Sequence, residues 1–231
     1  MATHFILEYI TPNNKSGLYI KTKELVYAFF IYFLVFLGCG ILMYTTDIFV
    51  VKVLHYPSIL KSHYNTDEYL KRKGLYLGAF LMTIKGPIVE ELSFRLLLRP
   101  TRINLLVSSI FSFLLFTELV FGYGTLINYF IRVVTAIIFS LCVLHYQSTI
   151  IYYLSHHKKN SLIVSSVLFG FTHILNFYPI QLSILFIYPI YVLPQICMGF
   201  ILGAIRLRNS IASSIALHIL INGSVVWYKL L

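Results

Sequence analysis

The sequence predicts an all-α membrane protein, a bundle of about seven spanning helices, from three observations. Of its 231 residues, 58% are hydrophobic and only 11% are charged, whereas a soluble protein carries roughly 25% charged residues. Long apolar runs recur along the chain, and a spanning helix needs about 20 mostly apolar residues. The basic residues lie mainly in short connectors between these runs, as is typical of residues that set membrane topology.

Each predicted span follows from the position of an apolar run. The run 160–205 is uncharged and too long for one crossing, and the turn sequence at Asn176–Pro179 divides it. The predicted spans are then 25–46, 74–98, 103–121, 126–155, 161–177, 180–205 and 209–228. The polar segment before residue 25 lacks the apolar core of a signal peptide. Residues 51–73 form a basic connector on the side predicted to be outside. Either this connector lies flat on the membrane surface, or the number of helices near the N-terminus differs by one.

Loop charge predicts the orientation and the polar partners. Three connectors carry paired basic residues: Arg99 and Arg102, Lys158 and Lys159, and Arg206 and Arg208. They alternate with two uncharged connectors, so the basic set is predicted to face the cytoplasm. The net charge is +10. We expect the basic residues that give this charge to contact membrane lipid rather than nucleic acid, because their clusters are too short to form a phosphate-binding stripe. We expect one membrane domain over residues 1–231, in the cell membrane if the source is bacterial.

Charged side chains inside the second predicted span are the first sign of a functional site. Each costs about 2.5–3.5 kcal/mol at the centre of a membrane helix, and this span holds Glu90, Glu91 and Arg95. Glu91 and Arg95 are four residues apart and can neutralise each other on one helix face. That structural interpretation gives no partner to Glu90, which lies about 100° round the helix from Glu91. The preceding Gly86-Pro87 predicts either a kink or a new helix start that would put both glutamates in a first turn.

Two later spans hold histidines at a similar depth. Phe169 and His173 are four residues apart, as are His218 and Asn222, so each pair lies on one helix face. A lone histidine in a membrane helix is more often a packed residue than a functional one. Counting ~1.5 Å per residue from the nearest cytoplasmic charge, Glu91 lies ~12 Å deep, His218 ~15 Å and His173 ~21 Å. We therefore expect these groups to meet in the cytoplasmic half of the membrane.

These residues resemble the three motifs of the CAAX proteases and bacteriocin-processing enzymes, also called the CPBP or Abi family. The pattern E-E-x-x-x-R occurs at 90–95, F-x-x-x-H at 169–173 and H-x-x-x-N at 218–222. They occur in the family's order, each in a predicted span. The resemblance covers residues 74–228, the expected catalytic core, and leaves out the N-terminal region 1–73. One departure is Leu96, where relatives often have glycine.

The resemblance implies an all-helical fold around a water-filled cavity open to the cytoplasm, and an intramembrane endopeptidase activity. By analogy, Glu90 would be the general base that activates a water molecule, with His173 helping to hold that water. His218 and Asn222 would stabilise the oxyanion that forms on the scissile carbonyl.

The remaining motif residues, Glu91 and Arg95, would orient and support the site. No cofactor is expected from the resemblance, because structures of the family favour a metal-free, glutamate-dependent reaction. Zinc is the alternative, with Glu90, His173 and His218 as its ligands. The sequence has no H-E-x-x-H motif.

The expected partners are membrane lipids and a peptide or membrane-protein substrate, with or without a lipid anchor. Two other functions stay open. A non-proteolytic membrane partner, such as a bacteriocin-immunity protein or a regulator of a sensor kinase, would not need Glu90. All six motif residues are retained, which favours the enzyme. A small transporter would also place charges at mid-depth, but the sequence shows no inverted repeat.

Overall fold

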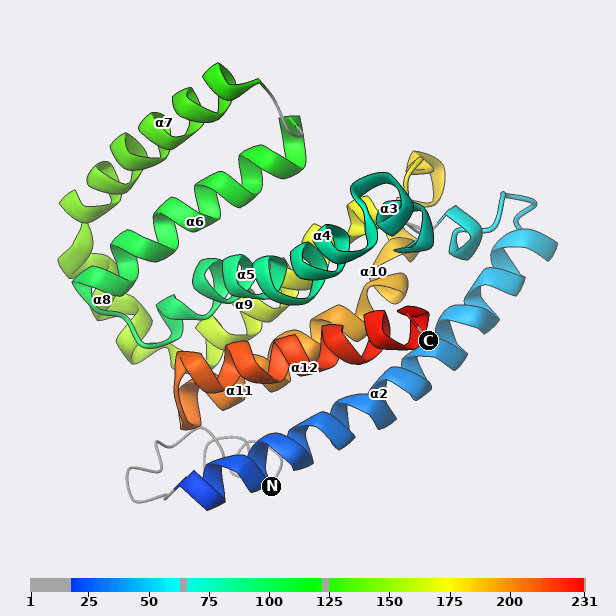
Figure 1. Ribbon diagram of the computed structural model, residues 1–231, viewed down its shortest axis with the longest axis horizontal. Helices are drawn as coiled ribbons and strands as arrows, with labels where there is room; N and C mark the ends of the chain where they lie inside the picture. The colour runs from blue at the N-terminus through cyan, green and yellow to red at the C-terminus, as the bar shows by residue number, and fades with distance from the viewer. Residues whose placement is uncertain (1–17, 63–65, 122–124, 231) are drawn as a thin grey trace.

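Helices are the only regular secondary structure in the part of the chain that the structure, a computed structural model, describes: residues 18–62, 66–121 and 125–230. Figure 1 shows α2 (Leu18–Lys52) along one side of the molecule and the hairpin of α6 (Arg102–Phe121) and α7 (Leu126–His145) on the opposite side. The predicted all-α class is confirmed. The polar segment up to residue 17 and residues 122–124 of an uncharged connector lie outside the described residues.

The N-terminal half of the predicted core begins with a run of short helices. After the 3-10 turn η1 (Leu60–Ser62) and α3 (Thr66–Lys73), the second predicted span consists of α4 (Leu75–Phe80), the π-helix η2 (Leu81–Lys85), α5 (Gly86–Phe94) and the 3-10 turn η3 (Leu96–Leu98). The backbone stays helical through Lys85 and Gly86, so the chain widens into a π-turn rather than stopping. Glu90 and Glu91 lie beyond the first turn of α5, so of the two alternatives for Gly86-Pro87, the one with both glutamates in a first turn was wrong.

The C-terminal half follows the other predicted spans with two further breaks. Its elements are α8 (Gln147–His156), α9 (Lys158–Thr172), η4 (His173–Asn176), η5 (Leu182–Ile187), α10 (Tyr188–Tyr191), α11 (Leu193–Arg208) and α12 (Ile211–Leu230). The single helix predicted over 126–155 is divided at Tyr146 into α7 and α8. This turn brings α8 back against α9 and η3, contacts that a straight helix would not make.

Several helices are long and apolar enough to cross a membrane. Within the described ranges these are Thr22–Lys52, Arg102–Phe121 and Leu126–His145, and the bent pair Leu182–Tyr191 and Leu193–Arg208, with a 43° angle, makes a fourth. The apolar part of α12, Ile211–Val226, is shorter. Large apolar side chains such as Leu34 are exposed on these helices, as lipid contact requires. The structure thus indicates a membrane protein, while seven spans and a cytoplasm-facing cavity stay predictions.

Small residues allow α9 and α11 to pack closely. A Cβ atom on Gly199 would lie 2.9 Å from Cα of Ser166, and one on Gly203 would lie 2.3 Å from Cδ1 of Leu162. Glycines four residues apart are a common means of close contact between membrane helices. This contact fixes α9, whose C-terminal end carries His173.

Polar contacts fix both ends of α2. Near its C-terminal end, Asp47 accepts hydrogen bonds from the hydroxyl groups of Ser58 (2.6 Å) and Tyr191 (3.1 Å). Near its N-terminal end, Glu24 pairs with Arg208 at 2.7 Å. These buried or half-buried partners join α2 to the connector after it and to α10 and α11.

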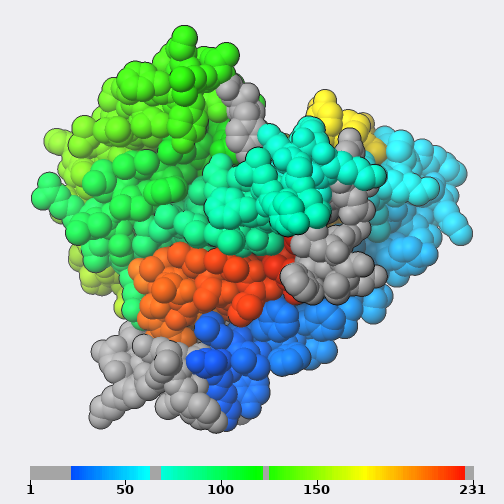
Figure 2. Space-filling model, in the orientation of Figure 1, coloured from blue at the N-terminus to red at the C-terminus, as the bar shows by residue number. Residues whose placement is uncertain are grey.

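The C-terminal helix α12 occupies the centre of the fold. It packs against η2 and α5 on one side and against α2 and α11 on the other. In Figure 2 the surface of α11 and α12 forms a band between the α4–α5 region and α2. The motif residues of α5 and α12 therefore face each other across one helix contact.

Candidate active site

A buried carboxylate, Glu91, is the centre of the site. It is fully buried, and its Oε1 lies 3.0 Å from Nδ1 of His218 and 3.6 Å from Nε of Arg95. Its Oε2 accepts a hydrogen bond from the hydroxyl of Ser214. An ionised carboxylate only accepts hydrogen bonds, so Nδ1 of His218 is the atom that carries the proton. Glu91 thus fixes the orientation of the imidazole, as a carboxylate does in a catalytic triad.

The other ring nitrogen of His218 faces the second glutamate. Its Nε2 lies 3.5 Å from Oε2 of Glu90, close enough for an ion pair but too long for a good hydrogen bond. His218 is 1% exposed at its side chain, whereas Glu90 is 22% exposed. Of these two side chains, Glu90 is therefore the one with exposed surface.

The geometry allows a hydrogen bond on this side of the ring. A protonated Nε2 of His218 can donate towards Glu90 or towards a group bound beside it.

The guanidinium group of Arg95 packs on aromatic rings and does not form a bidentate salt bridge with a carboxylate. Its guanidinium carbon is 4.1 Å from the centroid of the Phe169 ring and 5.7 Å from that of Phe94, distances at which a cation–π attraction acts. The side chain is fully buried, and within the described residues none of its three nitrogens has a hydrogen-bond partner. Buried guanidinium groups normally have hydrogen-bond partners, so the charge of Arg95 is offset here by the ion pair with Glu91 and by the two aromatic rings.

The ring of Phe169 joins the three motifs. Besides Arg95, it contacts the imidazoles of His173 (4.9 Å between centroids) and His218 (5.8 Å). Nδ1 of His173 lies 2.9 Å from the carbonyl oxygen of Phe169. A carbonyl only accepts, so Nδ1 carries the proton and Nε2 has the free lone pair. His173 thus joins the group through this aromatic ring, and it is only partly buried.

The place of Asn222 follows from the proline in α5. In the π-helix the N–H of Gly86 bonds the carbonyl of Leu81, five residues back. The next carbonyl, that of Met82, would pair with residue 87, which is a proline and has no N–H. Nδ2 of Asn222 donates to this carbonyl instead, at 3.1 Å. The second N–H of the same amide stays free for another acceptor.

The residues present do not fit a zinc site. In the ranges that the structure describes, no three His, Cys, Asp or Glu side chains are grouped closely enough to hold a metal ion. Glu90 and His218 approach each other, but His173 does not complete a ligand set with them. The alternative of zinc held by Glu90, His173 and His218 thus has no support from this geometry.

Comparison with known proteins finds a similarity in the C-terminal part. Residues 146–224 match a family model described as type II CAAX prenyl endopeptidase Rce1-like. This segment is thus similar to the CAAX-protease family. It contains His173, His218 and Asn222, and it confirms the resemblance drawn from the three motifs. The family supports a CAAX-protease-like endopeptidase. No curated protein and no solved structure matches the chain.

The remaining CAAX-protease motif residues lie outside the matched segment. Glu90, Glu91 and Arg95 precede residue 146, yet the structure places Glu90 and Glu91 against His218, which lies within the match. The sequence predicted this convergence. It gave no role to Ser214, although Ser214 is four residues before His218 and so lies on the same face of α12. That spacing was the available signal.

Proposed function

We propose that the protein is an intramembrane endopeptidase in which Glu90 activates a water molecule. The observation that carries this proposal is the position of His218 between two carboxylates. It is fixed by Glu91 at 3.0 Å on one ring nitrogen and faces the partly exposed Glu90 at 3.5 Å on the other. This arrangement provides a base, a positioned donor and access for water in one place.

The reaction follows from these positions. The carboxylate of Glu90 removes a proton from a water molecule, whose oxygen bonds to the carbon of the scissile carbonyl. The developing oxyanion accepts hydrogen bonds from Nε2 of His218 and from the free N–H of Asn222. The C–N bond then breaks, and the proton held by Glu90 moves to the departing amine.

The other motif residues support this step. His173 has its Nδ1 proton engaged by the carbonyl of Phe169, so its Nε2 is suited to accept a hydrogen bond from the attacking water. Arg95 is fully buried and acts on the site through Glu91 rather than on the reactant. Ser214 and Arg95 also hold Glu91, which keeps the imidazole of His218 in place.

The substrate class is a peptide or membrane-protein segment that reaches the site from the membrane. The matched family is described as a prenyl endopeptidase, so a lipidated C-terminal peptide is one candidate and an unmodified segment is another. We place the protein in the cell membrane, if the source is bacterial, as a multi-pass protein with the basic connectors inside.

Comparative proteomics of membrane peptides tests this function without a known substrate. Cells with the wild-type protein are compared with cells that carry Glu90→Gln, which keeps the shape of the side chain but removes the base. Glu118→Gln, in α6 away from the site, is the control. We expect uncleaved precursors to accumulate with Glu90→Gln only. Identical peptide profiles, together with an unchanged cellular phenotype, would instead favour a non-proteolytic membrane partner.

A further inference from the structure

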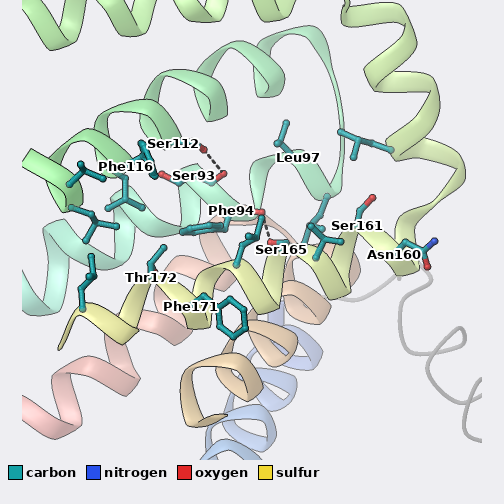
Figure 3. Close-up of a pocket in the computed structure, with 18 of the residues that line it drawn as sticks. Ser93, Phe94, Leu97, Ser112, Phe116, Asn160, Ser161, Ser165, Phe171 and Thr172 are labelled. Atoms are coloured by element: carbon teal, nitrogen blue, oxygen red, sulfur yellow. Dashed lines mark hydrogen bonds between the residues drawn. The ribbon is translucent and has the colours of Figure 1, made fainter. Parts of the chain in front are cut away.

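A groove of about 620 Å³ lies on the other side of α5 from the candidate active site. It is formed by α5 and η3, α6, α8 and α9, and Figure 3 shows α9 along its length with Asn160 and Thr172 towards opposite ends. Pockets for small ligands have volumes of about 300–1,000 Å³. The ring of Phe94 lines the groove and packs on Phe169 at 5.7 Å, and Phe169 in turn contacts His218, so this aromatic pair lies between the groove and His218.

The serine and threonine hydroxyl groups along the groove already donate to backbone carbonyls. Ser112 donates to the carbonyl of Ser93, and Ser165 donates to the carbonyl of Phe94 (Figure 3). The other serine and threonine hydroxyls, those of Ser93, Ser161 and Thr172, also bond backbone carbonyls. A ligand therefore meets an apolar surface along nearly the whole groove.

The polar end of the groove is far from His173 and His218. The exposed Asn160 lies at this end, and Lys158 and Lys159, both exposed, begin α9 just before it. The opposite end, at Thr172 and Leu175, is next to His173 and is apolar except for the engaged hydroxyl. The ligand that fits is thus an amphiphile with an anionic head near Lys158 and Lys159.

The groove is long enough to hold one lipid chain. From Asn160 to Leu175 the helix rises about 22 Å, and one leaflet of the hydrocarbon core is about 15 Å thick. Exposed apolar residues of α9, Val164 and Leu168, line it, so a chain can enter sideways from the bilayer. A lipidated substrate fits less well, because its peptide must lie at the histidines and the polar end of the groove is at the other end.

We propose that this groove binds one acyl chain of an anionic phospholipid, whose headgroup contacts Lys158 and Lys159. The site is separate from the proposed peptidase chemistry, since none of the residues that line the groove belongs to the group around Glu91 and His218. It would keep α9 and the ring of Phe94 in place against Phe169.

Native mass spectrometry of the purified, delipidated protein tests this site. Phosphatidylglycerol and phosphatidylcholine are added separately, and the bound lipid is measured. We expect one phosphatidylglycerol to bind, with a roughly tenfold or greater loss of binding in Val164→Trp or Leu168→Trp, which fill the groove. Ile138→Trp, on the exposed face of α7, is the matched control and should bind as the wild type does.

A second set of variants tests the contact of the lipid headgroup with Lys158 and Lys159. Exchange of Lys158 and Lys159 for Gln should lower the preference for phosphatidylglycerol over phosphatidylcholine by roughly ten- to thirtyfold. The same exchange at Lys52 and Lys61 should not. Equal lipid binding by Val164→Trp, Leu168→Trp and the wild type would overturn the proposal.

A second measurement needs no groove variant. Phosphatidylglycerol with a photoreactive diazirine in its acyl chain, added at equimolar ratio to the wild type, should label α6 and α9 around Val164 and Phe116. Labelling spread evenly over α2 and α7 would overturn the proposal. So would displacement of the lipid by an equimolar farnesylated peptide, because the groove would then belong to a substrate.

Discussion

A single serine of α12, Ser214, connects the buried carboxylate of Glu91 in α5 to the backbone of α11. The hydroxyl of Ser214 contacts Glu91 and also lies 3.0 Å from the carbonyl of Leu202, and Ser214 is fully buried. We therefore interpret Ser214 as a positioning residue that holds Glu91, and through it His218.

Removing this hydroxyl should slow catalysis without weakening substrate binding. For Ser214→Ala we expect kcat to fall about tenfold with little change in KM, since one hydrogen bond of about 1.4 kcal/mol that orients the imidazole is lost. Steady-state kinetics measure both constants. Ser224→Ala is the control, because that hydroxyl bonds only a carbonyl of its own helix. Wild-type kcat in Ser214→Ala would refute the positioning role.

Asn222 and Pro87 should be energetically coupled. Asn222→Ala leaves the carbonyl of Met82 without a donor and should cost about 1 kcal/mol of stability. Pro87→Ala provides an N–H that can bond the same carbonyl, so the cost of Asn222→Ala should be smaller in that background. Thermal unfolding of the four proteins in detergent forms a double-mutant cycle. Strictly additive changes in Tm would show that the two residues do not share this carbonyl.

Much of the site was predictable from residue spacing, and some contacts were not. The costly charges of Glu90, Glu91 and Arg95 in one span, with His218 at a similar depth, predicted the convergence that the structure shows. The contact of Asn222 with Met82 was not predictable, because it depends on which carbonyl Pro87 leaves unpaired inside a π-helix. Serine in a membrane helix commonly bonds its own backbone, so the four-residue spacing of Ser214 from His218 was a weak signal by itself.

At the scale of the helices, the contact of α9 with α11 positions the second motif. Gly199→Ala would bring a Cβ atom 2.9 Å from the backbone of Ser166, and backbone cannot move aside as a side-chain end can. We expect a lower Tm for this variant in detergent. Gly40→Ala is the matched control, since a Cβ there has nothing within 4 Å, and its Tm should not fall. Equal Tm values for both variants would show that stability does not depend on the close approach of α9 and α11 at Gly199.

The helix boundaries illustrate what apolar runs do and do not encode. Run length and Gly or Pro positions predicted α6 and α12 closely, because lipid requires a continuous apolar helix. The turn between α7 and α8 at Tyr146 was missed, since both helices are apolar and only the packing of α8 on α9 distinguishes them. The π-helix before Gly86 was likewise invisible to a 3.6-residue period.

At the scale of the whole molecule, the orientation in the membrane remains a prediction from loop charge. Single cysteines at two exposed positions test it, one at the start of α9 and one in the connector after η4. A membrane-impermeant maleimide added to intact cells should label Tyr178→Cys, in an uncharged connector, and should label Lys159→Cys only after the cells are opened. The native cysteines lie in helices and serve as the background measured with the unsubstituted protein. The reverse labelling pattern would invert the proposed orientation and place the site at the outer face.

The central claim is that the carboxylate of Glu90, next to His218, activates water for peptide hydrolysis. Purified wild-type protein and Glu90→Gln, each in liposomes, are incubated in ¹⁸O-water with the membrane peptides that accumulate in Glu90→Gln cells. Mass spectrometry then measures new C-termini. The account predicts ¹⁸O-labelled termini with the wild type and none above empty liposomes with Glu90→Gln, whereas equal release by both proteins would contradict it.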